Sequence, residues 1–575
     1  MVKLTGFSGA PGFGAGDAFL LRRGALAVTP IPVADPREEV AILTDARARY
    51  LHQLALLSNE AHAGENDAAA AIFEGYRAMA DDPYFWTPVE ELISTRSVCA
   101  SYAIEQRRLE TVTAFLAAED DFLRARAADV TNVCREVMAE LQGVEGAVLL
   151  PPEGNRLVVF ARELSPADIA RLSSQRLAGI VTETGGTTSH TAILAQALGV
   201  PAVVGTGAFP KDLTEGTPVL VDGDAGEVLL RPDASQVSIF MQKLGSSRRR
   251  QVLFDACRGE PAVTRDGNTV RVCVNSGDKE SVDSFDPALC DGIGLFRTEF
   301  LYLAQKDYPS EDLQYEAYRS MAEKAAGKEL IIRTLDSGGD KQLPYMDLPR
   351  EDNPFLGYRA IRLCLDRPEL FKTQLRAILR AGTEGDVKLM FPMLVNLEEL
   401  LRAKELLAEA MAELEARGVP YRRDLPVGMM VETPAAVLLS DQFAKHVSFF
   451  SIGSNDLIQY TTAADRTNQR MGALYDSCNL SVLRSVRLVC QNAHAAGIPV
   501  GICGETASEP RLIPLWCAMG VDELSVAPAL VGRTKYLLRC LSRRDLQPEL
   551  DAVLEQGSVP AVKERLARIL AELPV

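Results

Sequence analysis

The stretch "FFSIGSNDLIQY", Phe449–Tyr460, places a short apolar run before polar residues and the start of a helical pattern. Such a run is typical of a buried strand that leads into a helix. Seven similar runs occur between residues 270 and 528: "VRVCVNS", "GIGLFRTE", "LIIRTLD", "VKLMFPM", "VGMMVET", "PVGICGE" and "ELSVAP". Eight strands with helices between most of them predict a (β/α)8 barrel over residues 259–575, and the count of eight favours it over a doubly wound sheet.

Residues 23–143 have a different pattern, in which apolar residues recur at intervals of three and four and glycine is sparse. The first helix has clear start signals, with Asp35 as its N-cap, Pro36 at the first helical position and Glu38 and Glu39 in the first turn. These are the residue types that satisfy a helix N-terminus. We therefore expect several long helices packed as a bundle.

Residues 144–232 contain short strands with turns between them: "GAVLL", "RLVVFAR", "LAGIVTET", "PAVVG" and "PVLVDGDAGEVLL". Helices alternate with some of these strands, which indicates a compact mixed α/β domain. Residues 1–22 are expected to complete this domain, so that the helical bundle is an insertion in it. Residues 233–258 predict a helical linker that is interrupted at Gly245.

The composition is that of an ordinary globular protein, at 47% hydrophobic and 24% charged residues, with a formal net charge of -17. This charge argues against nucleic acid or an anionic membrane surface as the main partner. The eleven cysteines are scattered without a C-x-x-C pair, which indicates reduced thiols and a cytoplasmic location. We recognise no signal peptide, and no apolar run approaches the length of a membrane span.

Arginines follow several of the predicted barrel strands. Arg297 and Arg333 end two strands, and Arg359 and Arg466 lie in segments that follow others. Because barrel active sites lie at the C-terminal ends of the strands, these side chains are expected to face one site. A guanidinium binds phosphate or carboxylate through two parallel hydrogen bonds, so the set suits a small, multiply negative substrate. The structural alternative is that each arginine pairs with an acid and holds a loop in place.

Polar side chains that suit a metal ion follow two other strands. Glu432 ends one strand, and Asn455 and Asp456 end the next. Two carboxylates together with phosphate oxygens of a substrate are a normal arrangement around Mg²⁺. The alternative is that "SND" only caps the following helix.

A thiol lies at another strand end, where Cys503 stands in "GICGET" between Gly501 and Gly504. The glycines allow a close approach of a ligand, so the thiol is a candidate proton donor or nucleophile. A small buried hydrophobic residue is the alternative role for a cysteine in such a place.

The chain has five histidines, and His190 has the most unusual surroundings, in "TGGTTSHTAILAQALGVP". Two glycines precede it, and an apolar helical pattern begins with it. The N–H groups of a helix N-terminus favour an anion and disfavour a protonated imidazole. His190 is therefore a candidate nucleophile that attacks phosphorus and then carries the phosphoryl group, with a plain capping role as the alternative.

Together these motifs resemble the phosphoenolpyruvate–protein phosphotransferase family, enzyme I of the bacterial sugar phosphotransferase system. The resemblance covers almost the whole chain in the order of the family. The matching segments are "GFSGAPGFGAG", "IFEGYRAMADDP", "GGTTSHTAILA", "GIGLFRTEFLY", "IIRTLDSGGDK", "NPFLGYRAIR", "GMMVETPAA", "FFSIGSNDLIQYTTAADR" and "GICGETA".

The resemblance implies a role for each candidate residue. His190 would be the phosphohistidine nucleophile, which takes the phosphoryl group of phosphoenolpyruvate, and Cys503 would protonate the enolate of pyruvate. Glu432 and Asp456 would bind Mg²⁺. The residues that would hold the phosphate and carboxylate of the substrate are Arg297, Arg333, Arg359, Arg466 and Asn455.

The resemblance also implies the partners. Residues 23–143 would dock the small phosphocarrier protein HPr, which receives the phosphoryl group from His190. Residues 1–22 and 144–232 would form the phosphohistidine domain. The barrel would bind phosphoenolpyruvate and mediate homodimerisation.

Three features depart from the family pattern. Thr187 and Gln196 stand where the family usually has arginine, and residues 474–484 lack the usual prolines. Two alternatives to the phosphotransferase therefore remain open. One is a divergent regulatory paralogue with slow turnover or a different phosphocarrier, and the other is an enzyme that passes phosphate from phosphoenolpyruvate to a small molecule.

Overall fold

The computed structural model describes residues 2–21, 26, 28–63, 67–117, 121–143, 156–164, 168, 176–186, 189–277, 285–303, 305–338, 344–346, 351–466, 468, 471–472 and 474–573. For residues 59–63, 67–71, 121–125, 190 and 197 it describes the backbone alone. The chain divides into two compact units, Met1–Arg248 and Arg249–Val575, and the division falls inside helix α8, Ala234–Cys257. The finer division of the first unit, into a mixed α/β domain and a helical bundle inserted in it, stays a prediction.

An eight-stranded mixed sheet forms the β part of the first unit, with strand order β1-β8-β7-β3-β4-β5-β6-β2. Strands β3 to β6 are parallel to their neighbours in that run, whereas β1, β2, β7 and β8 add antiparallel pairs. The strands are β1 Val2–Thr5, β2 Phe7–Ala10, β3 Phe13–Leu20, β4 Leu157–Ala161, β5 Leu177–Thr182, β6 Ala202–Val204, β7 Pro218–Asp222 and β8 Glu227–Leu230. Residues 146–150, where the sequence predicts one more strand, lie outside the described residues.

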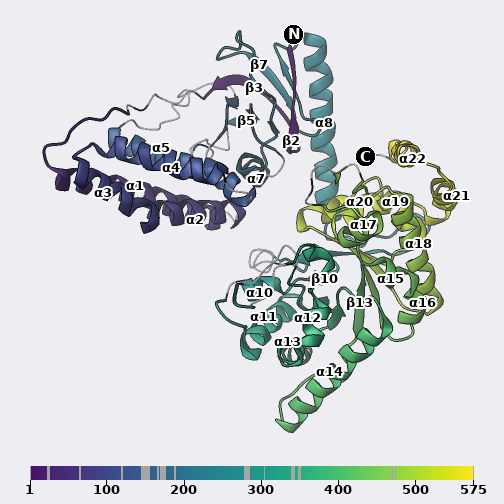
Figure 1. Cartoon of the computed structure of the whole chain (residues 1–575). Coiled ribbons are helices and arrows are strands. Elements are labelled where there is room, and N and C mark those ends of the chain that lie inside the picture. Colours follow the sequence, from purple (N-terminus) through teal and green to yellow (C-terminus); the bar gives the residue numbers. More distant parts are fainter. Residues whose placement is uncertain are drawn as a thin grey trace. The chain divides into compact units, whose positions relative to one another are not determined.

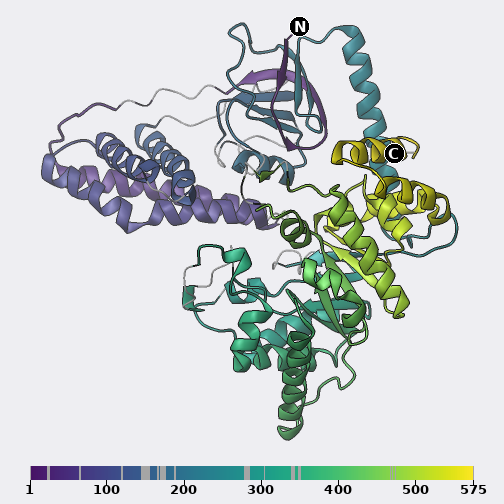
Figure 2. The same ribbon diagram turned by 45° about the vertical axis from the view of Figure 1, so that its right-hand side comes forward.

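Long helices make up the rest of the first unit, as Figures 1 and 2 show. They are α1 Pro36–Ala63, α2 Asp67–Asp81, α3 Pro83–Arg96, α4 Ala100–Ala117 and α5 Asp121–Gln142. Helix α1 begins at Pro36, and Asp35 accepts a hydrogen bond from the backbone of Arg37 at 2.9 Å, as its N-cap assignment predicts. Helix α2 packs against the short helix α7, His190–Ala197, so the bundle contacts the element that carries His190.

The second unit is a closed barrel of eight parallel strands, which confirms the predicted (β/α)8 fold. The strands are β9 Arg271–Ser276, β10 Gly292–Phe296, β11 Glu329–Arg333, β12 Val387–Phe391, β13 Val427–Val431, β14 Phe450–Gly453, β15 Val500–Cys503 and β16 Glu523–Val526. Seven of them lie within one of the eight apolar runs, and β11 begins one residue before its run. Strand β16 pairs with β9 in parallel and closes the barrel.

Helices surround the barrel strands (Figures 1 and 2). The helices are α10 Glu299–Leu303, α11 Glu311–Lys324, α12 Ile361–Asp366, α13 Pro368–Ala381, α14 Leu397–Ala416, α15 Pro434–Leu438, α16 Ser440–Phe443, α17 Ser454–Thr462, α18 Leu480–Ala495, α19 Ile513–Met519, α20 Val531–Cys540, α21 Arg543–Leu554 and α22 Val559–Ala571. Short 3-10 turns join some of them, at η1 Pro344–Met346, η2 Pro354–Leu356, η4 Glu505–Ser508 and η5 Pro528–Leu530.

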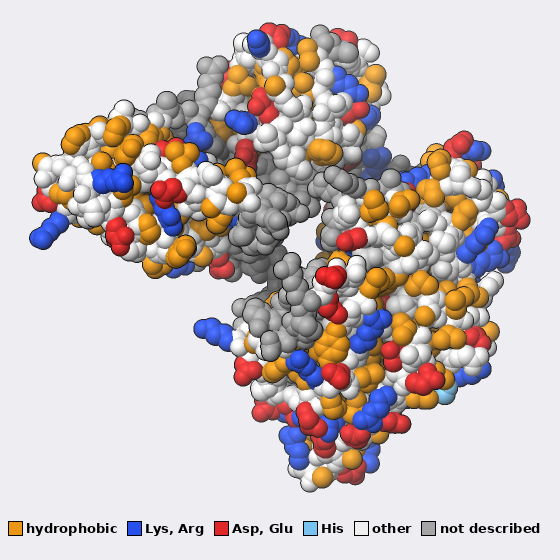
Figure 3. All heavy atoms as spheres, in the orientation of Figure 1, with side chains coloured by type: hydrophobic (Ala, Val, Ile, Leu, Met, Phe, Trp, Pro, Cys, Tyr) orange, Lys and Arg blue, Asp and Glu red, His pale blue; other side chains and the backbone are white. Residues whose placement is uncertain are grey.

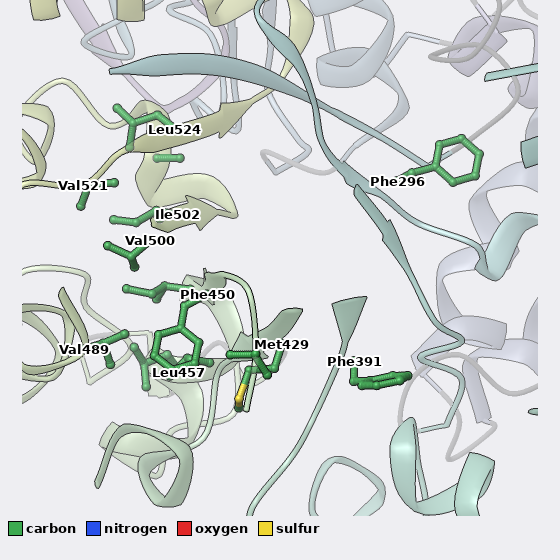
Figure 4. Close-up of a cluster of buried hydrophobic side chains, with 14 of the residues drawn as sticks. Phe296, Phe391, Met429, Phe450, Leu457, Val489, Val500, Ile502, Val521 and Leu524 are labelled. Carbon is green, nitrogen blue, oxygen red and sulfur yellow. The ribbon is translucent and has the colours of Figure 1, made fainter. Parts of the chain in front are cut away.

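The barrel strands are buried on both faces, because alternate side chains point into the barrel and out toward the helices. One small cluster fills the barrel and contains Leu295, Met390, Met430 and Cys503 among others. The neighbouring residues in the strands belong to the larger core beneath the helices. Figure 4 shows several of these outward side chains, including Phe296, Phe391, Met429 and Phe450.

The linker differs from the sequence prediction in one respect. Helix α8 runs without a break through Gly245, so the predicted interruption there is wrong. A glycine inside a helix costs only about 1 kcal/mol relative to alanine, and the helical residues on both sides outweigh that cost.

All eleven cysteines are free thiols, and no helix in the described part of the chain is long and apolar enough to cross a membrane.

Candidate active site

Arg333 ends strand β11 and is buried at the mouth of the barrel. Its guanidinium lies 2.9 Å from the carboxylate of Glu299 and 3.1 Å from that of Asp336. Burial alone would lower the pKa of Arg333, but the charges of Glu299, Asp336 and Glu432 outweigh it and raise the pKa. The arginine therefore stays charged in a place from which water is excluded.

Arg359 is the centre of a second group of ion pairs, on the far side of Asp336. It binds both carboxylate oxygens of Asp336 at 2.9 Å, and its Nη1 lies 3.3 Å from Asp456 and 3.1 Å from the hydroxyl of Tyr460. Arg466 approaches the same Asp456 oxygen at 3.8 Å. Acids and arginines thus alternate across the mouth, and Asp336 bridges the two buried arginines.

The backbone around Arg359 is held in an uncommon conformation. Ala360, the next residue, has φ 53° and ψ −127° and is fully buried. Gly338 has φ +116°, and a Cβ added there would lie 2.5 Å from the Cβ of Arg359. Strained residues of this kind persist where the surrounding structure holds a functional side chain in place. Gly338 thus provides both the conformation and the space that Arg359 needs.

Glu432 follows strand β13 and is almost completely buried. Its Oε1 accepts a 2.6 Å hydrogen bond from the backbone N–H of Met393, whereas its Oε2 is buried without a hydrogen-bond partner among the described residues. Burial, followed by the charges of Asp456 and Asp336, raises the pKa of Glu432 to about 8. Gly453 makes room for this carboxylate, because a Cβ there would lie 2.7 Å from Oε2.

These observations fit a divalent cation at the mouth. Glu432 has a buried carboxylate oxygen with no donor beside it, and the charge of the nearby Asp456 helps to raise its pKa, so a cation held by these two hard oxygen ligands would relieve the repulsion between them. No group of three or more histidine, cysteine or acidic ligands occurs in the described part of the chain. Mg²⁺ needs no such group, since it is usually held by one or two carboxylates plus oxygens of the substrate and water.

Asn455 lies at the start of helix α17, beside the turn that begins with Glu505. Its Nδ2 donates to a carboxylate oxygen of Glu505 at 3.4 Å, and its Oδ1 accepts from the backbone N–H of Glu505 at 3.3 Å. Arg297 follows strand β10, and a Cβ on Gly277 would lie 2.9 Å from its Cβ. Both residues are therefore at the C-terminal ends of the barrel strands, where the sequence places them.

Cys503 ends strand β15 with its thiol inside the barrel. The Oγ of Ser451 donates a hydrogen bond to its Sγ at 3.2 Å, and the thiol faces the backbone oxygen of Ile452 at 3.6 Å. Burial raises the pKa of Cys503 to about 11, while the hydrogen bond from Ser451 acts in the opposite direction. The thiol is thus a neutral acid at physiological pH, which suits a proton donor better than a thiolate nucleophile.

His190 is the first residue of helix α7 in the other unit. Ser189 caps this helix, since its side chain accepts a hydrogen bond from the N–H of Ala192 at 3.3 Å. Gly185, in the loop before the helix, has φ +109°, a conformation that favours glycine. The backbone thus places His190 at a capped helix N-terminus, as the sequence predicts.

Thr187 and Gln196 are the two residues near His190 that depart from the family pattern. Thr187 lies outside the described residues. Gln196, the second-last residue of α7, donates from Nε2 to the backbone oxygen of Gly9 at 2.7 Å and so ties the helix to strand β2. Glutamine at this position therefore has a structural contact of its own.

Sequence reasoning missed three residues of the mouth. Glu299 and Asp336 balance the buried arginines, and Ser451 contacts the thiol of Cys503. All three residues stand inside the apolar runs quoted from the sequence. An acid or a hydroxyl within a buried strand, or directly after it, is therefore the sequence feature that could have identified them. What the sequence could not give is which arginine or thiol lies opposite each of them.

Three family models match the chain, and all describe PEP-utilising enzymes. The N-terminal model covers residues 5–126, the mobile domain residues 153–226 and the PEP-binding domain residues 253–543. The fold and the mouth of the barrel thus define a PEP-utilising enzyme, and the last model spans the barrel with its arginines and acids.

Curated relatives narrow the class further. The phosphoenolpyruvate-protein phosphotransferase of Geobacillus stearothermophilus is 40% identical over 97% of this chain and 96% of its own length. The protein of that name from Priestia megaterium is 38% identical over 98% of both chains. The chain belongs to the phosphoenolpyruvate-protein phosphotransferase family and is an enzyme. A solution structure of an Enzyme I protein is 30% identical, covers 43% of this chain and 99% of its own, and has a TM-score of 0.36.

Proposed function

We propose that this enzyme transfers the phosphoryl group of phosphoenolpyruvate to His190 and then to a histidine of the phosphocarrier HPr, with release of pyruvate. The observation that carries the proposal is the mouth of the barrel, where buried arginines and two carboxylates meet beside an unpartnered oxygen of Glu432. Such a set binds a small anion with two charged ends. This is the first step of the sugar phosphotransferase system in the family that the chain resembles.

The arginines bind and orient the substrate. Arg297, Arg333, Arg359 and Arg466, with Asn455, hold the phosphate and the carboxylate of phosphoenolpyruvate. Because Asp336 fixes both Arg333 and Arg359, their guanidinium groups are in place before the substrate arrives. Fixed charges that face the transferred group stabilise the transition state without a cost of reorganisation.

Glu432 and Asp456 would hold Mg²⁺, which neutralises charge on the phosphate oxygens when it is bound. The phosphoryl group leaves as the bridging P–O bond breaks and a P–N bond forms to the imidazole of His190. The electron pair of the broken bond remains on the enolate of pyruvate. The thiol of Cys503 then gives its proton to the methylene carbon of that enolate, and the product is pyruvate.

His190 suits the covalent step because it begins helix α7. The N–H groups of this helix favour the phosphoryl group that the imidazole then carries. Since α7 packs against α2, the bundle of α1 to α5 presents a docking surface for HPr next to the phosphorylated residue. A small-molecule acceptor would need no such surface.

We also propose that two copies pair through the barrel and that the enzyme works in the cytoplasm. Exposed leucines on the barrel unit, such as Leu438 at 72% and Leu356 at 67%, offer apolar area for a second copy. Figure 3 shows that hydrophobic side chains lie between mixed charges on the visible face of this unit. The free thiols suit a reducing compartment.

The test is isotope exchange between phosphoenolpyruvate and labelled pyruvate, followed by addition of HPr. The wild-type enzyme should exchange label in the presence of Mg²⁺ and pass phosphate to HPr. The Cys503→Ala variant should still lose phosphate from phosphoenolpyruvate to His190 but form pyruvate slowly. Exchange that proceeds without Mg²⁺, or phosphorylated enzyme that never labels HPr, would refute the corresponding part of the proposal.

A further inference from the structure

A second cavity opens on the barrel unit between helices α18 and α21, which lie side by side (Figure 1). Its volume of about 580 Å³ is that of a site for a small metabolite. Charged and polar side chains form most of its wall. Those used in the argument are Asp266, Asn268, Arg487, His494, Arg543 and Arg544.

This cavity lies at the end of the barrel opposite the mouth. Asn268 precedes strand β9, His494 closes the helix before β15, and Met519 closes the helix before β16. All three therefore lie near the N-terminal ends of barrel strands. Glu432 and Asp456 follow the C-terminal ends of β13 and β14, so the two sites share no residue.

Two arginines of the cavity have no partner for their side chains. In the described part of the chain, which includes every residue from 474 to 573, the guanidinium groups of Arg543 and Arg544 form no ion pair and no hydrogen bond. Their backbone N–H groups donate to Asp266 at 3.0 and 2.9 Å. Asp266 also accepts a 2.7 Å hydrogen bond from Thr264, so its carboxylate already has its own donors.

The other side chains in the wall of the cavity add positive charge and few carboxylates without donors of their own. Arg487 is 2.9 Å from Asp551, and the ring of His494 is 3.2 Å from Asp522, which itself accepts from the backbone of Val500 at 2.9 Å. The three arginines that line the cavity face a single lining carboxylate, that of Asp266. On a chain with a net charge of -17, this is a local reversal of charge.

We propose that this cavity binds a small organic phosphate at a site separate from the catalytic mouth. The unpaired guanidinium groups of Arg543 and Arg544 would hold the phosphate, because their planar donor sets match phosphate oxygens. The volume leaves room for an organic part beside the phosphate. The site is also connected to the catalytic strand, since Asp522 links His494 to Val500 at the start of β15, which ends at Cys503.

The experiment is calorimetric titration of the full chain with glycerol 1-phosphate, without Mg²⁺ and at low salt. The double variant Arg543→Gln/Arg544→Gln should bind at least ~10-fold more weakly than the wild type, because it loses charge-assisted hydrogen bonds. Arg423→Gln removes an exposed arginine elsewhere on the unit and should bind as the wild type does. Arg297→Gln alters the mouth, so binding that it retains is assigned to the cavity.

Two measurements guard against a folding defect. The double variant should unfold at the same temperature as the wild type without the probe, and the probe should raise the unfolding temperature of the wild type more than that of the variant. Equal affinity in the wild type and the double variant would overturn the proposal. So would the absence of any heat of binding to the wild type at ~10 mM probe.

Discussion

Gly453 lets the backbone of strand β14 lie against the carboxylate of Glu432. Its φ of −78° is open to any residue, so only the space beside it calls for glycine. In Gly453→Ala the new Cβ would lie 2.7 Å from Oε2 and 2.9 Å from the Cβ of Glu432, and the carboxylate must move. We expect kcat/KM for phosphoenolpyruvate to fall by about 10²-fold, since small displacements of catalytic groups cost that much.

The matched control for this change is Gly557→Ala, where an added Cβ meets nothing within 4 Å. It should leave kcat/KM unchanged. Circular dichroism and thermal unfolding should show a folded barrel in both variants. A Gly453→Ala enzyme with wild-type kinetics would mean that the position of Glu432 does not matter for the reaction.

Ser451 is the one hydroxyl that contacts the sulfur of Cys503 among the described residues. In Ser451→Ala the sulfur loses this donor, so the pKa of Cys503 should rise by about one unit, the size of a single neutral hydrogen bond. Residue-specific alkylation by iodoacetamide, measured against pH by mass spectrometry, reports this pKa directly. Ser454→Ala is the control, because Ser454 donates to the backbone oxygen of Cys503 at 3.4 Å and not to the thiol. Identical alkylation profiles in all three proteins would contradict the role of Ser451.

In the proposed mechanism, the rate of the first step depends on helix α7, which carries His190. A positive side chain near the transferred group can contribute up to ~10²-fold to such a step, and Gln196 stands where the family usually has arginine. Gln196→Arg should therefore speed the phosphorylation of His190, most of all at low salt. Single-turnover labelling with phosphoenolpyruvate measures the rate.

The structure adds a control to this experiment. Gln196 holds α7 to β2 through Gly9, so Gln196→Ala isolates the loss of that hydrogen bond from the gain of a charge. The alanine variant should be no faster than the wild type. If the arginine variant is also equal or slower, charge at this position does not limit the chemistry.

The N-terminal ends of the barrel strands carry a charged cluster of their own. Glu523 lies inside the barrel near Glu329, with Arg271 2.8 Å from both carboxylates. Burial is the main cause that raises the pKa of Glu523 to about 7, with Arg271 opposing and Glu329 adding to the shift. A folded-state pKa above the usual value near 4.3 means that this residue contributes less stability as pH rises from about 4.3 to 7.

Glu523→Gln removes that titration and keeps the shape of the neutral acid. The difference in the free energy of unfolding of the barrel between pH 5 and pH 8 should therefore change by on the order of 2 kcal/mol relative to the wild type. Calorimetric unfolding of the full chain at the two pH values tests this. An unchanged pH dependence would show that Glu523 does not hold the proton.

At the scale of the whole molecule, the sequence predicts the barrel well because each strand is a short apolar run with clear limits. It predicts His190 at a helix start because two glycines precede an apolar helical pattern that begins there. Contacts between distant segments are not predictable in this way. The bridge from Asp336 to Arg333 and Arg359, and the pairing of Val2 with Leu230 that places β1 at the edge of the first sheet, depend on the tertiary fold.

The linker is a case in which a local sequence signal predicts a feature that the structure does not have. Gly245 predicts a break, yet α8 continues through it and joins the two units as one helix. The proposed reaction has His190, in one unit, receive phosphate from a substrate bound in the other. The account therefore demands that the chain bring α7 to the barrel mouth during each cycle.

The most direct test of the central claim is to map the phosphorylated residue after incubation of the full chain with phosphoenolpyruvate and Mg²⁺. Peptide mass spectrometry at alkaline pH preserves phosphohistidine and locates it. The account predicts phosphate on His190 in the wild type and none in His190→Ala, although His190→Ala still binds phosphoenolpyruvate in the barrel. Phosphate on another residue, or labelling of His190→Ala equal to that of the wild type, would contradict it.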